Sequence, residues 1–183
     1  IVIMELTKTI TDIKFIKRTI IVLIGTFILA LSARLQTPLA PVPATMQTFA
    51  VLLLGIMLGY KLAFISVLIY LIQGALGLPV FAAGGGIIYF TGPTSGYLFG
   101  FLLGAFFSGK IRPNQDSAIV FFKLLFSVSF IYMFGVIWLW FFKGLSTNFN
   151  EIFAIGAKPF LLIELYKLLI LAVLSNLIFK IRP

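Results

Sequence analysis

The chain has 183 residues, of which 61% are hydrophobic and 10% are charged, and its 14 Lys and Arg against 5 Asp and Glu give a formal net charge of +9. An ordinary soluble domain is about 45–50% apolar and about 25% charged, so this composition excludes a soluble globular protein and indicates one embedded in lipid. The chain contains neither His nor Cys, which excludes disulfides, zinc thiolate sites and histidine catalysis.

Charge-free stretches define the predicted spans, because a transmembrane helix needs about 20 mostly apolar residues. The stretch 62–109 is uncharged and too long for one crossing, and glycine and proline interrupt it at 77–79, 84–86 and 92–93. It is therefore predicted to cross twice. Pro38, Pro41 and Pro43 delay the preceding helix, since proline disfavours helix interiors. We expect an all-α integral membrane protein, a single membrane domain over 1–183, with six transmembrane helices at about 15–34, 46–60, 62–78, 93–109, 118–142 and 159–179.

The basic residues predict the orientation of these helices, because cytoplasmic loops are enriched in Lys and Arg. Three of them, Arg34, Lys143 and Lys158, fall on one side of the membrane. Both termini are therefore expected in the cytoplasm, in a multi-pass protein of the plasma (inner) membrane. The short run before Met4 is unlike a cleaved signal, and scattered charge argues against nucleic acid as a partner. The ten basic residues on the predicted cytoplasmic side are Lys8, Lys14, Lys17, Arg18, Lys61, Lys110, Arg112, Lys123, Lys180 and Arg182.

Two outward-facing segments, 36–47 and 78–86, are uncharged and rich in proline or glycine. Irregular backbone at membrane depth is tolerated where it is buried in protein or lines a cavity. Consecutive glycines also allow the backbone to approach a ligand closely. The segments either line a binding cavity or simply connect short helices.

The last predicted span contains Glu164, the one acidic residue inside any predicted helix, with Lys167 three positions later. Residues at i and i+3 share a helical face, so both charged groups can point into one cavity. An intramembrane charge costs about 2.5–3.5 kcal/mol on insertion scales, which favours a functional role. The alternative is a self-satisfied ion pair that holds the bundle together.

Small residues mark two predicted helix contacts. Thr26, Ala30 and Ala33 form a stripe at i, i+4 and i+7, which lets another helix approach closely. Its partner is either an internal helix or another protein. Glycines at 96, 100 and 104 predict internal packing of the fourth span. Trp138 and Trp140 are predicted to lie in an interfacial aromatic belt, although Trp138 is also placed to cover a ligand ring.

Several motifs, taken together and in order, resemble the BioY family, the biotin-binding S components of energy-coupling factor (ECF) transporters. The resemblance covers about residues 19–180 and departs from the family at Glu164, where Asp is usual, and at Ser95, where the family's GPTGGY has Gly. The motifs are Pro41-Val42-Pro43-Ala44-Thr45-Met46-Gln47-Thr48, Gly77-Leu78-Pro79-Val80-Phe81-Ala82, Gly92-Pro93-Thr94-Ser95-Gly96-Tyr97-Leu98, Gly135 with Trp138-Leu139, and Pro159-Phe160 followed by Glu164 and Lys167.

The resemblance implies a six-helix subunit that captures substrate under its outer loops and reorients in the bilayer to release it. It implies no enzymatic step and no cofactor, with biotin as the transported ligand. The partners it implies are a transmembrane coupling protein and two ATPases. A motif for nucleotide hydrolysis is absent from this sequence, which is consistent with ATP hydrolysis by partner proteins. The small-residue stripe is then the candidate docking face, and it matches the family's alanine-rich motif only in part, because Gly25, Thr26 and Leu29 replace alanines.

The chemistry of biotin suggests roles for the candidate residues. In the family, the acid and the lysine of the sixth helix contact the vitamin, and Glu164 is expected to accept the ureido N–H groups in charge-assisted bonds. Lys167 is expected to donate to the ureido carbonyl or to the valerate. Thr45 and Gln47 are predicted to supply neutral polar contacts, and Phe81, Tyr89 and Tyr97 to cover the apolar rings. Gly84 and Gly85 are predicted to let the backbone approach the ligand closely.

Three alternatives stay open at the level of sequence. One is an S component for another vitamin, and a second is a solitary gradient-driven or facilitative carrier. The third is a membrane enzyme that acts on lipid with Glu164 as its base. The lack of His, Cys or a paired carboxylate argues against the enzyme.

Overall fold

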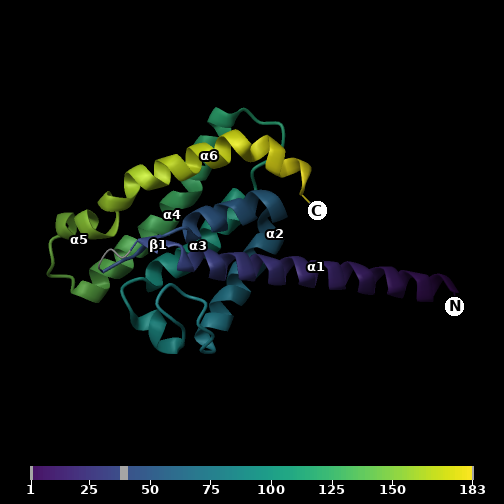
Figure 1. The fold of residues 1–183 in the computed structure, drawn as a ribbon, viewed down its shortest axis with the longest axis horizontal. Helices are drawn as coiled ribbons and strands as arrows, with labels where there is room; N and C mark the ends of the chain where they lie inside the picture. Colours follow the sequence, from purple (N-terminus) through teal and green to yellow (C-terminus); the bar gives the residue numbers. More distant parts are fainter. Residues whose placement is uncertain (1, 38–40, 183) are drawn as a thin grey trace.

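The structure, a computed structural model, describes the backbone of residues 2–37 and 41–182 and the side chains of 13–37 and 41–182. It is built from helices with one small hairpin, and the polypeptide crosses back and forth along the long axis of the body (Figure 1). The elements are α1 (Val2–Arg34), β1 (Gln36–Thr37), β2 (Ala44–Thr45), α2 (Gln47–Ala75), η1 (Ile87–Thr91), α3 (Ser95–Ser108), α4 (Ser117–Lys143), α5 (Phe149–Gly156), η2 (Lys158–Phe160) and α6 (Leu161–Lys180).

Helix α2 contains the second and third predicted spans as two segments joined by a kink. The kink is at Gly59, whose φ of 75° and ψ of 166° are not helical, whereas the sequence placed the boundary at Lys61. Glycine suits this position because a side chain at positive φ is strained. An added Cβ would also lie 2.2 Å from the Arg182 guanidinium. The predicted change of direction is present, two residues earlier than expected.

Three features were not predicted from the sequence. Helix α1 begins at Val2 rather than near residue 15, because no glycine or proline interrupts residues 2–24. Helix α5 occupies a stretch expected to be a loop, and Asn148 caps it by accepting a hydrogen bond from the Asn150 amide at 2.9 Å. The strands β1 and β2 pair antiparallel, Gln36 with Thr45 and Thr37 with Ala44, which holds these two short stretches side by side.

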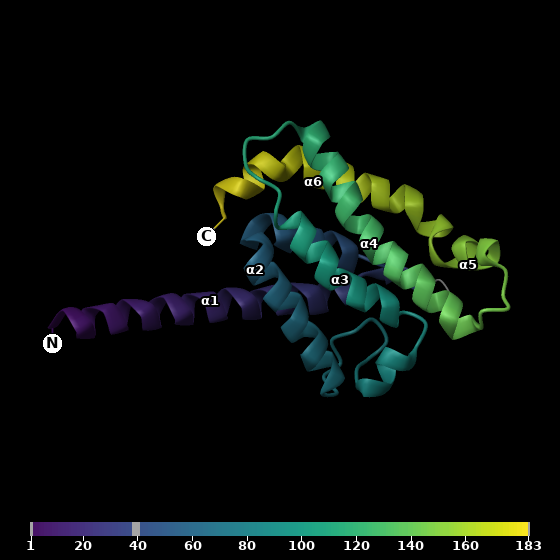
Figure 2. The same cartoon turned by 180° about the vertical axis from the view of Figure 1, so that it is seen from behind.

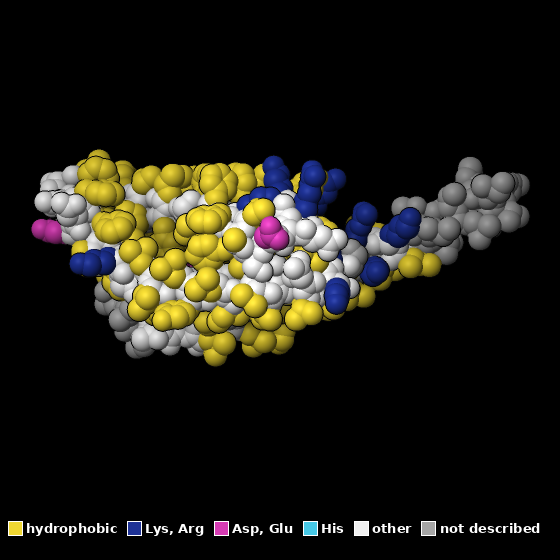
Figure 3. All heavy atoms as spheres, turned by 90° about the horizontal axis from the view of Figure 1, so that it is seen from above, with side chains coloured by type: hydrophobic (Ala, Val, Ile, Leu, Met, Phe, Trp, Pro, Cys, Tyr) yellow, Lys and Arg dark blue, Asp and Glu magenta, His cyan; other side chains and the backbone are white. Residues whose placement is uncertain are grey.

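Apolar side chains cover the outside of the helices, as expected for a protein in lipid. Residues such as Phe15, Phe27, Leu162 and Val173 are exposed, and hydrophobic atoms dominate the surface in Figure 3. Four stretches of the described chain are long and apolar enough to span a membrane: Ile13–Arg34, Gln47–Ala75, Ser117–Lys143 and Phe149–Lys180. The protein is therefore a multi-pass membrane protein. The count of six crossings and the single-domain division remain predictions.

Helix α3 lies in the middle of the bundle, packed against α2 on one side and α4 on the other, and α6 packs on α4 and α2 (Figures 1 and 2). Helix α1 packs on α2 and projects beyond the body. The start of α1 and the end of α6 lie toward the same end of the molecule (Figure 1). Which side of the membrane that is remains a prediction.

Glycines allow the close contact between α3 and α4, as predicted. A Cβ on Gly96 would lie 2.3 Å from the Phe134 carbonyl oxygen, and one on Gly100 would lie 2.7 Å from the Ile131 Cα. Backbone atoms cannot move aside as a flexible side chain can. The predicted internal packing role of these glycines is confirmed.

Replacement of Gly100 by leucine is therefore expected to separate α3 from α4 and lower the melting temperature of the detergent-purified protein by several degrees. Overpacking of this kind costs about 1–3 kcal/mol, and more where backbone is in the way. Leu103→Val on the same helix, where the side chain is only half-buried, serves as the control. A thermal unfolding curve for Gly100→Leu that matches the wild type would contradict the packing.

Candidate functional site

Helix α6 places an acid and a base one turn apart in the interior of the bundle. The Lys167 Nζ lies 2.7 Å from the Glu164 Oε1, and the two side chains are 7% and 8% exposed, respectively. The predicted convergence of the two groups on one helical face is thus present in the structure. An ion pair this dry needs further hydrogen bonds to offset its desolvation.

Residues at the start of α2 supply those hydrogen bonds. The Thr48 hydroxyl donates to the Glu164 Oε1 at 2.8 Å and accepts from the Lys167 Nζ at 3.0 Å. The ammonium also donates to the Thr45 carbonyl oxygen at 2.8 Å. An ammonium has three donors, and all three are therefore used within the chain. The sequence analysis missed Thr48, although it directly follows the predicted Gln47.

The second carboxylate oxygen of Glu164 is different, because it is buried and has no hydrogen-bond partner in the described part of the chain. A buried acceptor normally receives a hydrogen bond, since leaving it without a donor costs about 1–3 kcal/mol, and more for a charged group. Ser95 Oγ is likewise unpartnered, but Ser95 does not line the cavity described next. Glu164 therefore has one charged acceptor oxygen for which the described residues show no hydrogen bond, near the Tyr132 phenol in the same wall.

Glu164 lies in the wall of a cavity enclosed by α2, α3, α4, the turn before α6 and the two outer segments. The volume that the centres of water molecules can occupy in the cavity is about 50 Å³. Its walls are mostly apolar and aromatic, with a few polar groups, which is the usual character of a small-molecule site. The lining residues are Val42, Pro43, Ala44, Thr45, Gln47, Thr48, Ala82, Tyr89, Thr94, Tyr97, Leu98, Phe101, Tyr132, Phe160 and Glu164.

Four of the predicted site residues besides Glu164 therefore line the cavity: Thr45, Gln47, Tyr89 and Tyr97. Tyr97 is held in place by a 2.6 Å bond from its hydroxyl to the Gly156 carbonyl oxygen, at the end of α5. Sequence reasoning missed Thr94, Phe101, Tyr132 and Phe160. Of these, Thr94 and Phe160 lie inside motifs already noted, whereas nothing local distinguishes Tyr132 from the other aromatic residues of α4.

Hydrogen bonds tie the two outer segments together, and two of the residues involved, Gln47 and Ala82, line the cavity. Gln47 donates from Nε2 to the Tyr70 hydroxyl at 2.7 Å, and that hydroxyl donates to the Val80 carbonyl oxygen at 3.0 Å. Arg34, at the end of α1, donates to the Pro79 carbonyl oxygen at 2.5 Å. The Gln36 side chain donates from Nε2 to the Ala82 carbonyl oxygen at 3.2 Å. The predicted lining role of these segments is thus partly met, through Val42–Thr45 and Ala82.

The other predicted contact residues, Phe81, Gly84 and Gly85, are not among those that line the cavity. Phe81 is fully buried, 4.7 Å from the Tyr89 ring and 5.3 Å from the Tyr70 ring between centroids. It therefore supports Tyr89 rather than lining the cavity. Gly84 pairs with Phe81 in a tight turn at a φ of 130°. A Cβ on Gly85 would lie 2.0 Å from the Leu78 carbonyl oxygen. These two glycines shape the turn.

Lys167 is not among the residues that line the cavity. Its three donors bond to Glu164, Thr48 and Thr45. A direct bond from Lys167 to a ligand therefore requires one of these bonds to break. The geometry favours a different role, in which the ammonium fixes one carboxylate oxygen and leaves the other free. Trp138 donates from Nε1 to the Gly92 carbonyl oxygen at 2.8 Å and anchors the loop before α3.

The small-residue stripe on α1 is largely internal. Thr26 is 4% exposed and Ala33 is fully buried, while Ala30 is half-buried. Neighbouring Gly25 meets Ser66 of α2 closely, since a Cβ there would lie 2.7 Å from the hydroxyl oxygen. Helix packing within the chain therefore covers Thr26 and Ala33, and the docking role of the stripe stays a prediction.

The BioY family model matches residues 5–183 of this sequence. The chain belongs to the BioY family. It is 40% identical over 139 residues to a probable biotin transporter BioY of Pyrococcus horikoshii, covering 75% of this chain and 81% of that protein. It is 36% identical over 154 residues to the biotin transporter BioY of Thermotoga maritima, covering 83% and 89%, respectively.

A solved S-component structure has the same fold. The crystal structure of an S-component for biotin from an ECF-type ABC transporter superimposes with a TM-score of 0.80 at 26% sequence identity. The match covers 91% of this chain and 93% of the solved chain. The cavity with its buried acid thus lies in a chain that the BioY family model matches over nearly its whole length.

Proposed function

We propose that this chain captures biotin in the cavity at Glu164 and carries it across the plasma membrane as the S component of an ECF-type transporter. One observation above the others supports this: Glu164, a buried acid with one carboxylate oxygen that has no hydrogen-bond partner among the described residues, belongs to the wall of a mostly apolar, aromatic cavity. The relatives named biotin transporters and the solved S-component for biotin give the ligand class. Biotin is the transported ligand, and no cofactor is part of the proposal.

Biotin suits such a cavity by its chemistry. Its ureido ring carries two N–H donors, its thioether ring is mostly apolar, and its valerate tail ends in a carboxylate. The ureido N–H groups are the natural donors to Glu164 Oε2, because hydrogen bonds to a charged acceptor are roughly twice as strong as neutral ones. The aromatic residues Tyr89, Tyr97 and Phe160 line the cavity and cover the apolar rings. Gln47 and Thr45 supply neutral polar contacts.

The energy for uptake comes from partner proteins in this proposal. The chain contains no nucleotide-binding motif, so a transmembrane coupling protein and ATPase subunits complete the transporter. Six crossings with both termini in the cytoplasm place the cavity on the outer side, where substrate is captured. Of the proposed docking stripe, only Ala30 has a side chain partly open to such a partner.

Equilibrium binding of radiolabelled biotin to the detergent-purified protein tests the ligand. We expect saturable binding at one site that unlabelled biotin displaces and a large excess of thiamine or riboflavin does not. Displacement by either competitor would assign the chain to another vitamin. Uptake of biotin by this chain alone, in vesicles without ATP, would contradict the ECF arrangement and favour a solitary carrier.

The tyrosine that links the outer segments gives a further prediction. Tyr70→Phe removes the donor to the Val80 carbonyl oxygen and the acceptor for Gln47, so the cover over the cavity loosens. We expect bound biotin to dissociate several-fold faster, since each lost bond is worth about 0.5–1.5 kcal/mol. Tyr60→Phe, in the same helix but half-exposed, is the control. An unchanged dissociation rate in Tyr70→Phe would show that these bonds do not hold the cover closed.

A further inference from the structure

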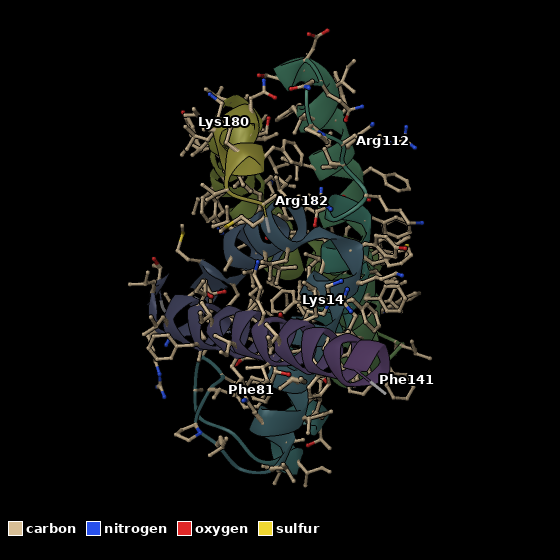
Figure 4. All side chains as sticks on the ribbon, turned by 90° about the vertical axis from the view of Figure 1, so that its right-hand side faces the viewer. Lys14, Phe81, Arg112, Phe141, Lys180 and Arg182 are labelled. Carbon is tan, nitrogen blue, oxygen red and sulfur yellow. The ribbon has the colours of Figure 1, made fainter. Side chains whose placement is uncertain are left out.

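A second groove lies at the opposite, basic end of the molecule. It lies between α1, the kink of α2 and Arg182 near the C-terminal end. The volume that the centres of water molecules can occupy in it is about 730 Å³. Figure 4 looks onto this end, with Arg182 next to the kink, and in Figure 3 the dark blue Lys and Arg atoms gather there. Its lining residues are Phe15, Arg18, Thr19, Val22, Leu23, Leu58, Gly59, Tyr60, Lys61, Leu62, Ile65, Ile69 and Arg182.

The groove joins two kinds of surface. Arg18, Lys61 and Arg182 bring three positive charges together from three parts of the chain, and no acidic residue is part of the lining. Apolar side chains make up most of the remainder and continue onto the lipid-facing surface at Leu23 and Ile65, which are 50% and 41% exposed. A cationic end and an apolar wall are complementary to an anionic amphiphile.

The three cations are not neutralised by the described side chains. The ion pair found among those side chains is that of Lys167 with Glu164, in the other half of the molecule. Arg182 contacts neutral acceptors, the carbonyl oxygens of Gly109 and Ile111, at 3.5 Å each. Gly59 leaves space for its guanidinium, since a Cβ there would lie 2.2 Å away. The kink therefore positions a guanidinium in the groove with donors to spare.

We propose that this groove binds one anionic phospholipid of the cytoplasmic leaflet. The phosphate lies between Arg18, Lys61 and Arg182, and the acyl chains follow the apolar wall of α1 and α2. Guanidinium groups bind phosphate oxygens through paired N–H donors, and basic pockets between transmembrane helices on the cytoplasmic side bind anionic headgroups. A zwitterionic lipid offers no net negative charge to the three cations, so the groove discriminates by headgroup.

The test compares two triple variants with the same change in net charge. Arg18→Gln/Lys61→Gln/Arg182→Gln removes the groove cations, and Lys110→Gln/Arg112→Gln/Lys123→Gln removes three basic residues on the same predicted side but outside the groove. Native mass spectrometry of the full-length protein measures binding of phosphatidylglycerol and of phosphatidylcholine. We expect the groove variant to bind phosphatidylglycerol at least about tenfold more weakly, and the control variant to bind within twofold of the wild type.

Other results would overturn the proposal. An equal loss in both triple variants would show general attraction by the basic end, and unchanged binding in the groove variant would place the lipid elsewhere. Competition by inorganic phosphate would assign a free anion. Loss of co-purification with the coupling protein, while phosphatidylglycerol binding is kept, would assign the groove to a protein partner. Biotin binding by the groove variant is expected to stay within twofold of the wild type, which verifies its fold separately.

A photoactivatable lipid locates the site directly. Phosphatidylglycerol with a diazirine in its acyl chain is expected to label the α1 and α2 residues along the groove, such as Leu23 and Ile65, and the label is expected to disappear in the groove variant. Labelling spread evenly over the lipid-facing helices would contradict a defined site.

Discussion

Replacement of Glu164 by alanine is expected to weaken equilibrium biotin binding by more than tenfold. The change removes the free acceptor Oε2 and also leaves the Lys167 ammonium buried without its counter-charge. A hydrogen bond to a charged acceptor is worth about 1.5–3 kcal/mol, which corresponds to tenfold or more in affinity, and the broken ion pair is expected to lower the stability of the fold as well. Radiolabelled biotin titrated into the purified variant measures the loss.

Two controls separate this effect from general damage. Glu164→Asp keeps the charge with one methylene less and restores the residue usual in the family, so it is expected to retain binding within about tenfold. Glu151→Ala removes an exposed acid on α5 and is expected to bind as the wild type. Wild-type affinity in Glu164→Ala would remove the acid from the site and return it to a purely structural role.

Replacement of Lys167 by methionine is the second change with a large expected effect. The stem of the side chain is kept, but the three hydrogen bonds of the ammonium are lost and the Glu164 carboxylate is left buried with Thr48 as its donor. We expect biotin affinity to fall more than tenfold and the melting temperature to fall as well, because an unpaired buried charge is strongly destabilising. Lys158→Met, at an exposed position, is the control.

The double variant Glu164→Gln/Lys167→Met distinguishes a binding role from a structural one. It contains no unpaired charge, so the melting temperature is expected to recover toward the wild type. The affinity for biotin is expected to stay low, since an amide oxygen is a neutral acceptor and bonds less strongly to N–H donors. Recovery of both quantities together would identify the pair as a structural ion pair without a ligand.

The helices of this protein were largely predictable, because each was read from an apolar stretch with few or no charges, bounded by charges, glycines or prolines. Helices lie at all the predicted stretches, and the boundary predicted at Lys61 lies two residues from the kink at Gly59. Helix α5 was not predicted, because its eight residues show no distinctive charge pattern and lie between two longer segments. The small outer hairpin was missed because its strands are two residues each.

The site was predictable where local spacing decided it. Helical spacing alone places Glu164 and Lys167 on one face, and an acid in an apolar helix is conspicuous in any sequence. Which atoms remain free depended on residues far along the chain. Thr48, more than a hundred positions away, binds Oε1 and thereby leaves Oε2 as the free acceptor.

The membrane environment, the helical class and the pairing of a positive with a negative group follow from composition and from spacing within one helix. The bond from Lys167 to the acid, the support of Tyr89 by Phe81 and the burial of Thr26 and Ala33 on α1 are visible in the folded molecule alone. Hydrogen-bond partners and burial arise from segments distant in the chain, and the pattern of one segment carries no information about which neighbour will meet it.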